Sequence, residues 1–241
     1  MGRTFIFDYD DTLAWNQIDY SLAKVRFLDW VLGRLGHLAP DPLIILKMLE
    51  SANLKNIKSM GYNRERFPTS MREVYIKICS EDRIADPDGE EEAYRIGTSV
   101  FDFERWRKRG LVEGAEETLD FLIGQKDRLM IYTMGDLIAQ ADKMEATRVE
   151  RWFGQEIYIK PEKTPEVFAE LIDGLDKNKV WMVGNSEKSD ILPAIENGVR
   201  AIYIPYETWS IEDVKKGLPD SPLITKLDKI IEIKEKYKFL G

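Results

Sequence analysis

The sequence predicts an α/β protein in which a doubly wound (Rossmann-like) parallel sheet carries an inserted all-helical domain. Two patterns predict this fold: helical patterns alone occupy residues 16–108, and strands alternate with helices from there onward. A short apolar segment, residues 3–8, precedes the helical stretch and is typical of a buried strand. Alternating strands and helices favour right-handed βαβ units, which give a parallel sheet covered on both faces. We therefore expect an α/β core over 1–15 and 109–241 and a helical domain over 16–108.

Within the expected helical domain, apolar residues recur at the spacing of amphipathic helices. Turn residues followed by acidic residues, PDGEEE at 87–92, are typical of a helix start. No strand pattern interrupts this stretch of the sequence. The expected helices are 18–35, 41–52, 70–79 and 87–106.

In the expected core, short apolar runs predict strands and longer periodic segments predict helices. The expected strands are 3–8, 128–133, 156–160, 179–184 and 200–205. The expected helices are 114–125, 136–147, 164–175 and 189–198, followed by helical patterns from 210 to 239. Ligands of such sheets bind at the carboxyl ends of the strands. The residues that follow each strand are therefore the first place to look for a site.

Composition excludes several classes of function. The net charge of −8, without a basic tract, argues against a nucleic-acid partner. No apolar run is long enough to span a membrane, and no signal peptide is recognised at the start, so we expect a cytoplasmic protein without a membrane partner. Cys79 lacks a second cysteine for a disulfide, and His37 cannot form a zinc site alone. Catalysis must therefore rest on carboxylates, lysine, hydroxyls and a metal ion.

Polar side chains gather where the expected strands end. Asp8 and Asp10 close the first strand and, being two residues apart, face the same way in an extended chain. Two carboxylates about 4 Å apart repel by roughly 4 kcal/mol at an effective dielectric constant of 20, which a divalent cation would reverse. Oxygen ligands without histidine or cysteine favour Mg²⁺. The other strand-end groups are Thr133-Met134-Gly135, Lys160 to Lys163, and Gly184-Asn185-Ser186 with Asp190.

These strand ends, taken in order, resemble the four motifs of the haloacid dehalogenase superfamily, in its phosphatase branch. The matching residues are DYDDTL at 8–13, Thr133 in IYTMGD, Lys163 in KTPEVF, and VGNSEKSD at 183–190. The resemblance covers residues 1–14 and about 110–210. It also identifies the helical insert as the family's cap, placed between the first and second motifs.

The resemblance implies a role for each motif. Asp8 would be the nucleophile that forms an aspartyl-phosphate, and Asp10 the general acid and then base, with its backbone carbonyl on Mg²⁺. The phosphate-binding residues would be Thr133, Met134 and Lys163, and the metal-binding residues Asp8, Asp10, Asn185 and Asp190. Alternatives are a solvated first loop with Thr12 as a helix cap, Lys160 in place of Lys163, and Asp190 as a helix-starting residue.

Two positions depart from the family pattern. Asn185 stands where the family more often has aspartate, so Mg²⁺ would meet less negative charge there. Asp11 stands where the family often has glycine, and the sequence assigns it no role.

The family includes more than one reaction. A halide leaves without a proton whereas an alkoxide needs one, so Asp10 favours a phosphatase over a 2-haloacid dehalogenase. A phosphomutase, a phosphonate hydrolase and a non-enzymatic phospho-accepting signalling module remain alternatives. The expected partner is a small phosphorylated metabolite, and the sequence leaves the oligomeric state open. Residues that could contact the substrate from the cap are Arg64, Arg66, Trp106 and Arg107.

Overall fold

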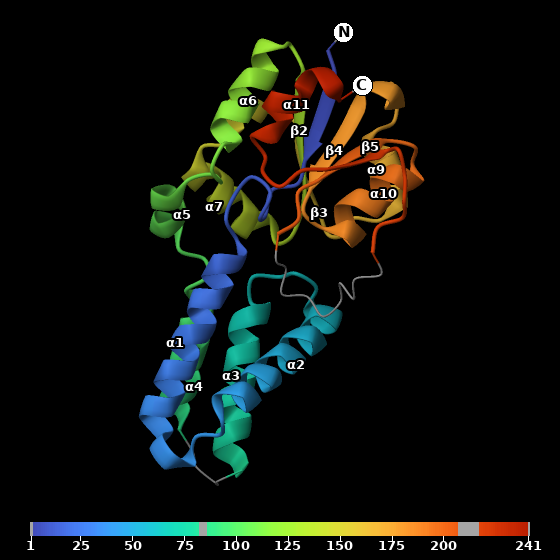
Figure 1. Cartoon of the computed structure of the whole chain (residues 1–241). Helices are drawn as coiled ribbons and strands as arrows, with labels where there is room; N and C mark the ends of the chain where they lie inside the picture. The colour runs from blue at the N-terminus through green and yellow to red at the C-terminus, as the bar shows by residue number, and fades with distance from the viewer. Residues whose placement is uncertain (1, 82–85, 207–216, 241) are drawn as a thin grey trace. The chain divides into compact units, whose positions relative to one another are not determined.

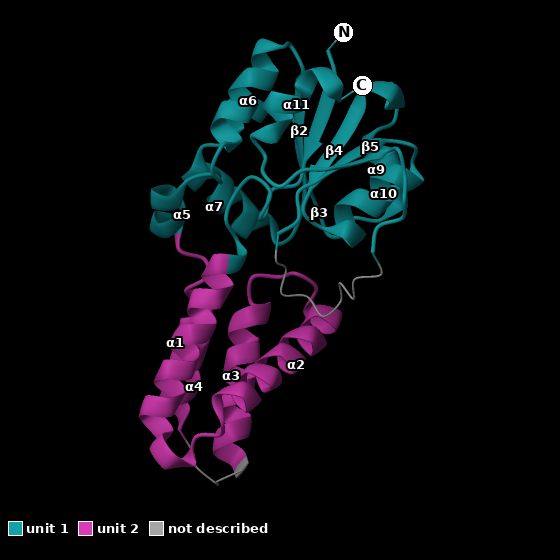
Figure 2. Ribbon diagram, in the orientation of Figure 1, with its two compact units in different colours: residues 1–17, 103–241 teal, residues 18–102 magenta. Residues whose placement is uncertain are grey.

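The computed structural model describes residues 2–81, 86–206 and 217–240. The chain divides into two compact units (Figure 2): unit 1 contains residues 1–17 and 103–241, and unit 2 contains residues 18–102. Unit 2 is thus an insertion in unit 1, and it ends six residues before position 108, where we expected the helical domain to end. None of the described helices is long and apolar enough to cross a membrane.

Unit 1 contains one parallel sheet of six strands in the order β3-β2-β1-β4-β5-β6 (Figure 1). The strands are β1 Thr4–Phe7, β2 Arg128–Met134, β3 Ile157–Lys160, β4 Val180–Gly184, β5 Arg200–Tyr203 and β6 Ile224–Lys226. The strand order runs outward in both directions from β1, which makes its carboxyl end the topological switch point of the sheet. The predicted doubly wound parallel sheet is confirmed.

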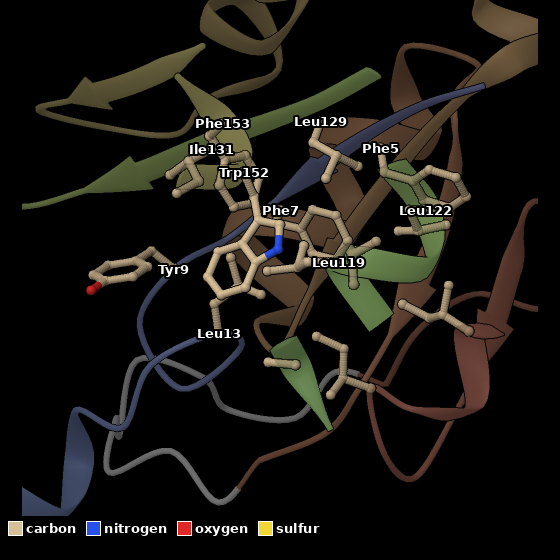
Figure 3. Close-up of a cluster of buried hydrophobic side chains, with 14 of the residues drawn as sticks. Phe5, Phe7, Tyr9, Leu13, Leu119, Leu122, Leu129, Ile131, Trp152 and Phe153 are labelled. Atoms are coloured by element: carbon tan, nitrogen blue, oxygen red, sulfur yellow. The ribbon is translucent and has the colours of Figure 1, made fainter. Parts of the chain in front are cut away.

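Alternating side chains of β1 face two different cores. Phe5 and Phe7 belong to the larger cluster (Figure 3), and Ile6 belongs to the smaller cluster on the other face. The helices that contribute to the larger cluster are α6 Ala115–Gly124, α7 Leu137–Thr147, α8 Glu150–Phe153 and α11 Glu232–Lys236. Those on the smaller cluster are α9 Pro165–Leu171 and α10 Leu192–Glu196. Every residue of β1 after Thr4 is buried, so hydrophobic packing fixes the strand from both sides.

Unit 2 is a group of helices around its own apolar cluster. The helices are α1 Gln17–Leu35, whose first residue lies in unit 1, α2 Pro42–Met60, α3 Arg66–Glu81 and α4 Pro87–Thr98. Two of them begin at an aspartate followed by proline: Asp41 accepts from Leu43 N at 2.8 Å, and Asp86 accepts from Gly89 N at 3.1 Å. Such caps satisfy backbone N–H groups that the first turn leaves without partners.

The single helix expected over 87–106 is wrong. The chain ends α4 at Thr98 and starts α5, Phe103–Arg109, in unit 1. Ser99 Oγ donates to the Ile96 carbonyl at 2.6 Å, and Val100 is buried in the cluster of unit 2. A serine hydroxyl that binds a nearby backbone carbonyl competes with the helical hydrogen bonds. The helical spacing of apolar residues in the sequence runs on past this point, and it therefore did not reveal the boundary between the two units.

The helical patterns expected from 210 to 239 are largely wrong. Ile224–Lys226 forms strand β6, which pairs with β5, and α11 and the 3₁₀ turn Tyr237–Phe239 are the helical elements that follow it. The β-branched Ile224 and Thr225 fit an edge strand better than a helix. The first part of that expectation, residues 210–216, lies outside the described residues.

Candidate active site

The loop after β1 brings Asp8 to the switch point of the sheet. Asp8 N donates to Val183 O at 2.8 Å, which continues the pairing of β1 with β4. The chain then turns: the N–H groups of Leu13 and Ala14 both donate to Tyr9 O at 2.9 Å, and Asp11 has a φ of 58°. This turn fixes the backbone from Asp8 onward, with the side chain of Asp8 buried.

Lys163 joins two buried carboxylates. Its Nζ donates to Asp8 Oδ1 at 2.5 Å and to Asp190 Oδ1 at 2.7 Å, and its side chain is 2% exposed. Thr164 caps α9 by accepting from Val167 N at 3.3 Å, and Pro165 opens the helix, so the lysine is held just before its first turn. Lys163, and not its competitor Lys160 at the end of β3, is the lysine that reaches Asp8.

Asp190 lies on a π-helical turn, Glu187–Ile191, that follows β4. Its Oδ2 accepts from Ser186 N at 2.9 Å. A Cβ on Gly184 would lie 2.3 Å from this oxygen, so only glycine leaves room for the carboxylate there. With Lys163 on its other oxygen, Asp190 is a partner of the lysine, and its predicted contact with a metal stays a prediction.

Burial and charge act against one another in this cluster. The pKa of Asp8 is raised to about 7, because burial, together with the nearby carboxylate of Asp190, outweighs the lowering by Lys163. For Lys163, burial lowers the pKa, but the two carboxylates outweigh it and the pKa lies above its ordinary value. The lysine therefore stays charged, and its charge is needed by the two aspartates it joins.

The side-chain amide of Asn185 lies beside two oxygens of the β1 loop. One end of the amide is 3.3 Å from Asp8 Oδ2, 3.2 Å from the Asp10 carbonyl oxygen and 3.1 Å from Thr12 Oγ1. If that end is the nitrogen, it donates to all three oxygens. If it is Oδ1, it accepts from Thr12 Oγ1 and lies beside two further acceptors, Asp8 Oδ2 and the Asp10 carbonyl oxygen. Neighbouring oxygens around Mg²⁺ are about 3 Å apart at Mg–O distances of about 2.1 Å. With Oδ1 at that end, its separations of 3.3 and 3.2 Å from Asp8 Oδ2 and the Asp10 carbonyl oxygen match those of neighbouring magnesium ligands.

Thr133 and Met134 end β2, the strand beside β1. Thr133 is 1% exposed, and its Oγ1 has no hydrogen-bond partner within the described part of the chain. Buried hydroxyls are nearly always hydrogen-bonded, so this hydroxyl, at the carboxyl end of a strand beside β1, is available to donate to a ligand atom. The Met134 carbonyl accepts from Gln140 Nε2 at 3.2 Å.

The carboxylate of Asp10 is held by two side chains of α7 that sequence reasoning missed. Gln140 Nε2 donates to Asp10 Oδ2 at 2.7 Å, and Lys143 Nζ donates to Asp10 Oδ1 at 2.6 Å. Asp136 caps α7 by accepting from Ile138 N and Ala139 N, which sets the phase of the helix. Positions three apart share a helix face, but the spacing does not say which face of α7 meets the β1 loop, so the sequence alone did not identify this pair.

Asp11, to which the sequence assigned no role, caps the first turn of α1. Its carboxylate accepts from Asn16 N at 2.9 Å and from Gln17 N at 3.0 and 3.1 Å. The pKa of Asp11 is raised to about 6, because burial outweighs the lowering by the hydrogen bonds from Asn16 and Gln17. The third carboxylate of the loop thus anchors the beginning of the helix that leads into unit 2.

The substrate-contact residues expected on the cap fall into different places. Trp106 and Arg107 lie on α5 in unit 1, where Trp106 is buried and Arg107 pairs with Glu104 at 2.5 Å. Arg66 is buried inside unit 2 and donates to Asn53. Arg64 lies 5.6 Å from the ring centre of Phe101, also in unit 2. Trp106 and Arg107 therefore belong to the α/β core and not to the helical insert, and Arg66 is buried within the insert.

Comparison with known proteins identifies the fold. A haloacid dehalogenase-like family hydrolase from Xanthomonas campestris is 23% identical, with 99% of this chain and 91% of that chain covered and a TM-score of 0.79. A phosphatase of the same superfamily from Thermococcus onnurineus is 17% identical (99% and 98% covered, TM-score 0.61). A 2-haloacid dehalogenase from Pseudomonas syringae pv. Tomato DC3000 is 18% identical (100% and 100% covered, TM-score 0.59). The chain thus has the haloacid dehalogenase-like fold, which confirms the fold that its motifs predicted.

No protein-family model matches the sequence, and no curated protein matches it. The fold is therefore established by structural similarity alone.

Proposed function

We propose that this chain is a Mg²⁺-dependent phosphatase that hydrolyses a small phosphorylated metabolite through an aspartyl-phosphate on Asp8. The observation that carries the proposal is Asp10, whose carboxylate is 23% exposed two residues after the buried Asp8. A leaving alkoxide needs a proton, which a second carboxyl group can supply, and a halide does not. The buried hydroxyl of Thr133 supports the same conclusion, because it could donate to a phosphoryl oxygen.

The reaction would take two steps. First, an oxygen of Asp8 attacks phosphorus, the bond from phosphorus to the leaving oxygen breaks, and Asp10 gives its proton to that oxygen. Second, Asp10 takes a proton from water, the water oxygen attacks phosphorus, and the bond from phosphorus to Asp8 breaks to release phosphate. Lys163 holds Asp8 in place throughout and offsets negative charge on the phosphoryl group.

The metal would be held by Asp8 Oδ2, the Asp10 carbonyl oxygen and Asn185 Oδ1. When bound, Mg²⁺ neutralises charge on the phosphoryl group. Asp190 remains a proposed fourth residue of the metal site, although both of its oxygens accept from Lys163 and Ser186 in this structure.

Phosphate release from p-nitrophenyl phosphate and from a panel of metabolite phosphates tests the proposal. We expect steady turnover that requires Mg²⁺ and that Asp8→Asn abolishes, whereas Asp173→Asn, an exposed matched control, leaves it unchanged. A single phosphorylation without turnover would instead indicate a signalling module, and return of the phosphoryl group to the product a mutase. Turnover of 2-haloacids alone would contradict the proposal.

A second candidate, a 2-haloacid dehalogenase, is favoured by the amide of Asn185. If its nitrogen faces Asp8 Oδ2 and the Asp10 carbonyl, it occupies the position that a cation would take. Asn185→Asp separates the two functions by thermal unfolding. With a magnesium site, the added carboxylate should strengthen the stabilisation by Mg²⁺; with a donating amide, the variant should be destabilised and Mg²⁺ should not restore it.

A further inference from the structure

Residues Gln140 and Lys143 of α7 contact both oxygens of the Asp10 carboxylate. Gln140 Nε2 is 2.7 Å from Oδ2, and Lys143 Nζ is 2.6 Å from Oδ1. Both side chains are buried, at 4% and 5% exposure for the whole residues, whereas the carboxylate they hold is 23% exposed. A carboxylate bound at both oxygens cannot rotate freely, so α7 fixes its direction.

The two holding side chains are themselves held. Gln140 Nε2 also donates to the Met134 carbonyl at 3.2 Å, and a Cβ on Gly135, whose φ is 150°, would lie 2.9 Å from that nitrogen. Lys143 Nζ also donates to Asn16 Oδ1 at 2.7 Å and lies 5.4 Å from the ring centre of the buried Trp106. The arrangement is therefore built from several elements of unit 1 and does not depend on one surface contact.

Lys143 also connects Asp10 to the start of α1. Asn16 lies one residue before α1 begins, and its side-chain oxygen accepts a hydrogen bond from Lys143 Nζ. The backbone N–H of Asn16 in turn donates to the carboxylate of Asp11. A shift at the start of α1 would therefore move Asn16, which shares the ammonium group of Lys143 with Asp10.

We propose that Gln140 and Lys143 are positioning residues for Asp10 and adapt the site to phosphomonoesters of aliphatic alcohols. The inference rests on the proposed function, in which Asp10 protonates the leaving oxygen. An aliphatic alkoxide is too basic to leave without that proton, whereas p-nitrophenolate is stable and leaves with little help. A proton donor held from two sides matters most when the leaving group is poor, because misplacement by about 1 Å can cost about 10²-fold in rate.

The leaving-group dependence of kcat/KM tests this positioning. We compare glycerol 2-phosphate with p-nitrophenyl phosphate in the wild type, Lys143→Met and Gln140→Met, each with Mg²⁺. We expect each variant to lose about 10- to 100-fold on glycerol 2-phosphate and less than about 3-fold on p-nitrophenyl phosphate. Lys179→Met, at an exposed lysine, is the matched control and should change neither value.

The outcomes separate this inference from the proposed function. If the wild type hydrolyses neither ester, the proposed function is wrong. If the wild type hydrolyses only the aryl ester, or if both variants lose equally on both esters, the positioning role is wrong, because a general loss of structure lowers both values alike. Thermal unfolding shows which variants fold; if Lys143→Met does not, Gln140→Met makes the same comparison.

Discussion

The two carboxylates at the end of β1, Asp8 and Asp10, have different surroundings, although only one residue separates them in the sequence. The side chain of Asp8 is 9% exposed and pairs with Lys163, whose other partner, Asp190, is 1% exposed. The side chain of Asp10 is 23% exposed and pairs with Lys143, which is 6% exposed. In the proposed reaction, the nucleophile has to be fixed and shielded, whereas the proton donor has to meet both the reactant and solvent. The comparison teaches that one loop can place two carboxylates in such different surroundings because a separate lysine holds each of them.

The two lysines are also placed by different parts of the fold. Lys163 precedes α9, and Asp190 lies on the π-helical turn after β4, so loops on two sides of β1 define the surroundings of Asp8. Gln140 and Lys143 both come from α7. The surroundings of Asp8 are therefore the more constrained of the two, and the following predictions test that contrast from the largest expected effect to the smallest.

Replacing the proposed nucleophile should have the largest effect. Asp8→Asn exchanges the attacking carboxylate for a poorly nucleophilic amide, and we expect kcat to fall by roughly 10⁴-fold or more on aryl and alkyl phosphates alike. Steady-state assays with both ester types measure this loss. A loss confined to one ester type would mean that Asp8 is not the attacking group.

Replacing the proposed acid, Asp10, should have a smaller effect that depends on the leaving group. Asp10→Asn keeps the shape of the side chain but cannot give a proton, so we expect kcat/KM to fall by about 10²- to 10⁴-fold on alkyl phosphates and clearly less on p-nitrophenyl phosphate. Equal losses on both esters would contradict the division of roles between the two carboxylates.

Removing the lysine of the buried cluster should cost both activity and stability. Lys163→Met leaves Asp8 and Asp190 buried without their shared cation, so we expect a loss of about 3–5 kcal/mol in the free energy of unfolding and of about 10²- to 10³-fold in kcat. Urea unfolding and steady-state kinetics measure the two effects. Lys160→Met, three residues earlier, is the matched control and should change both values little.

The corresponding change at the more open cluster sharpens the comparison. Lys143→Met leaves Asp10 partly in contact with water, so we expect a smaller loss of about 1–2 kcal/mol in the free energy of unfolding. Urea unfolding of the two lysine variants side by side gives the difference. Equal losses would mean that the two carboxylates are equally enclosed.

Changes at Asp11 should have the smallest effect on turnover. Asp11→Ala removes the cap of α1 and places alanine at a φ of 58°, so we expect a loss of about 1–2 kcal/mol in the free energy of unfolding. Asp11→Asn keeps a capping oxygen and a side chain that tolerates this backbone, and should lose less than half as much. Thermal or urea unfolding measures both variants; equal losses would contradict the capping role.

The sequence predicted the parts of the site that depend on strand ends. A buried strand that ends in a polar residue places it at the edge of the sheet, so Asp8 and Thr133 could be located from strand patterns. Lys163, three residues beyond its strand, was chosen over Lys160 from the resemblance to the family motif. The parallel sheet and its inserted helical unit could be predicted for the same reason, since both follow from the order of the elements along the chain.

The parts that depend on how elements are turned and packed could not be predicted. Which face of α7 meets the β1 loop is set by packing on the sheet, so Gln140 and Lys143 had no assigned role. The capping role of Asp11 requires its left-handed backbone conformation, which a carboxylate in a motif does not reveal. The strand Ile224–Lys226 depends on pairing with β5, a contact distant in the sequence.

Acid quenching of the enzyme during turnover of p-nitrophenyl phosphate with Mg²⁺ tests the central claim most directly. Mass spectrometry of the tryptic peptide 4–24 then shows whether a phosphoryl group is attached at Asp8. We predict that it is, and that Asp10→Asn, which lacks the base for the second step, accumulates more of it than the wild type. Release of phosphate without any phosphorylated peptide in either protein would contradict the account.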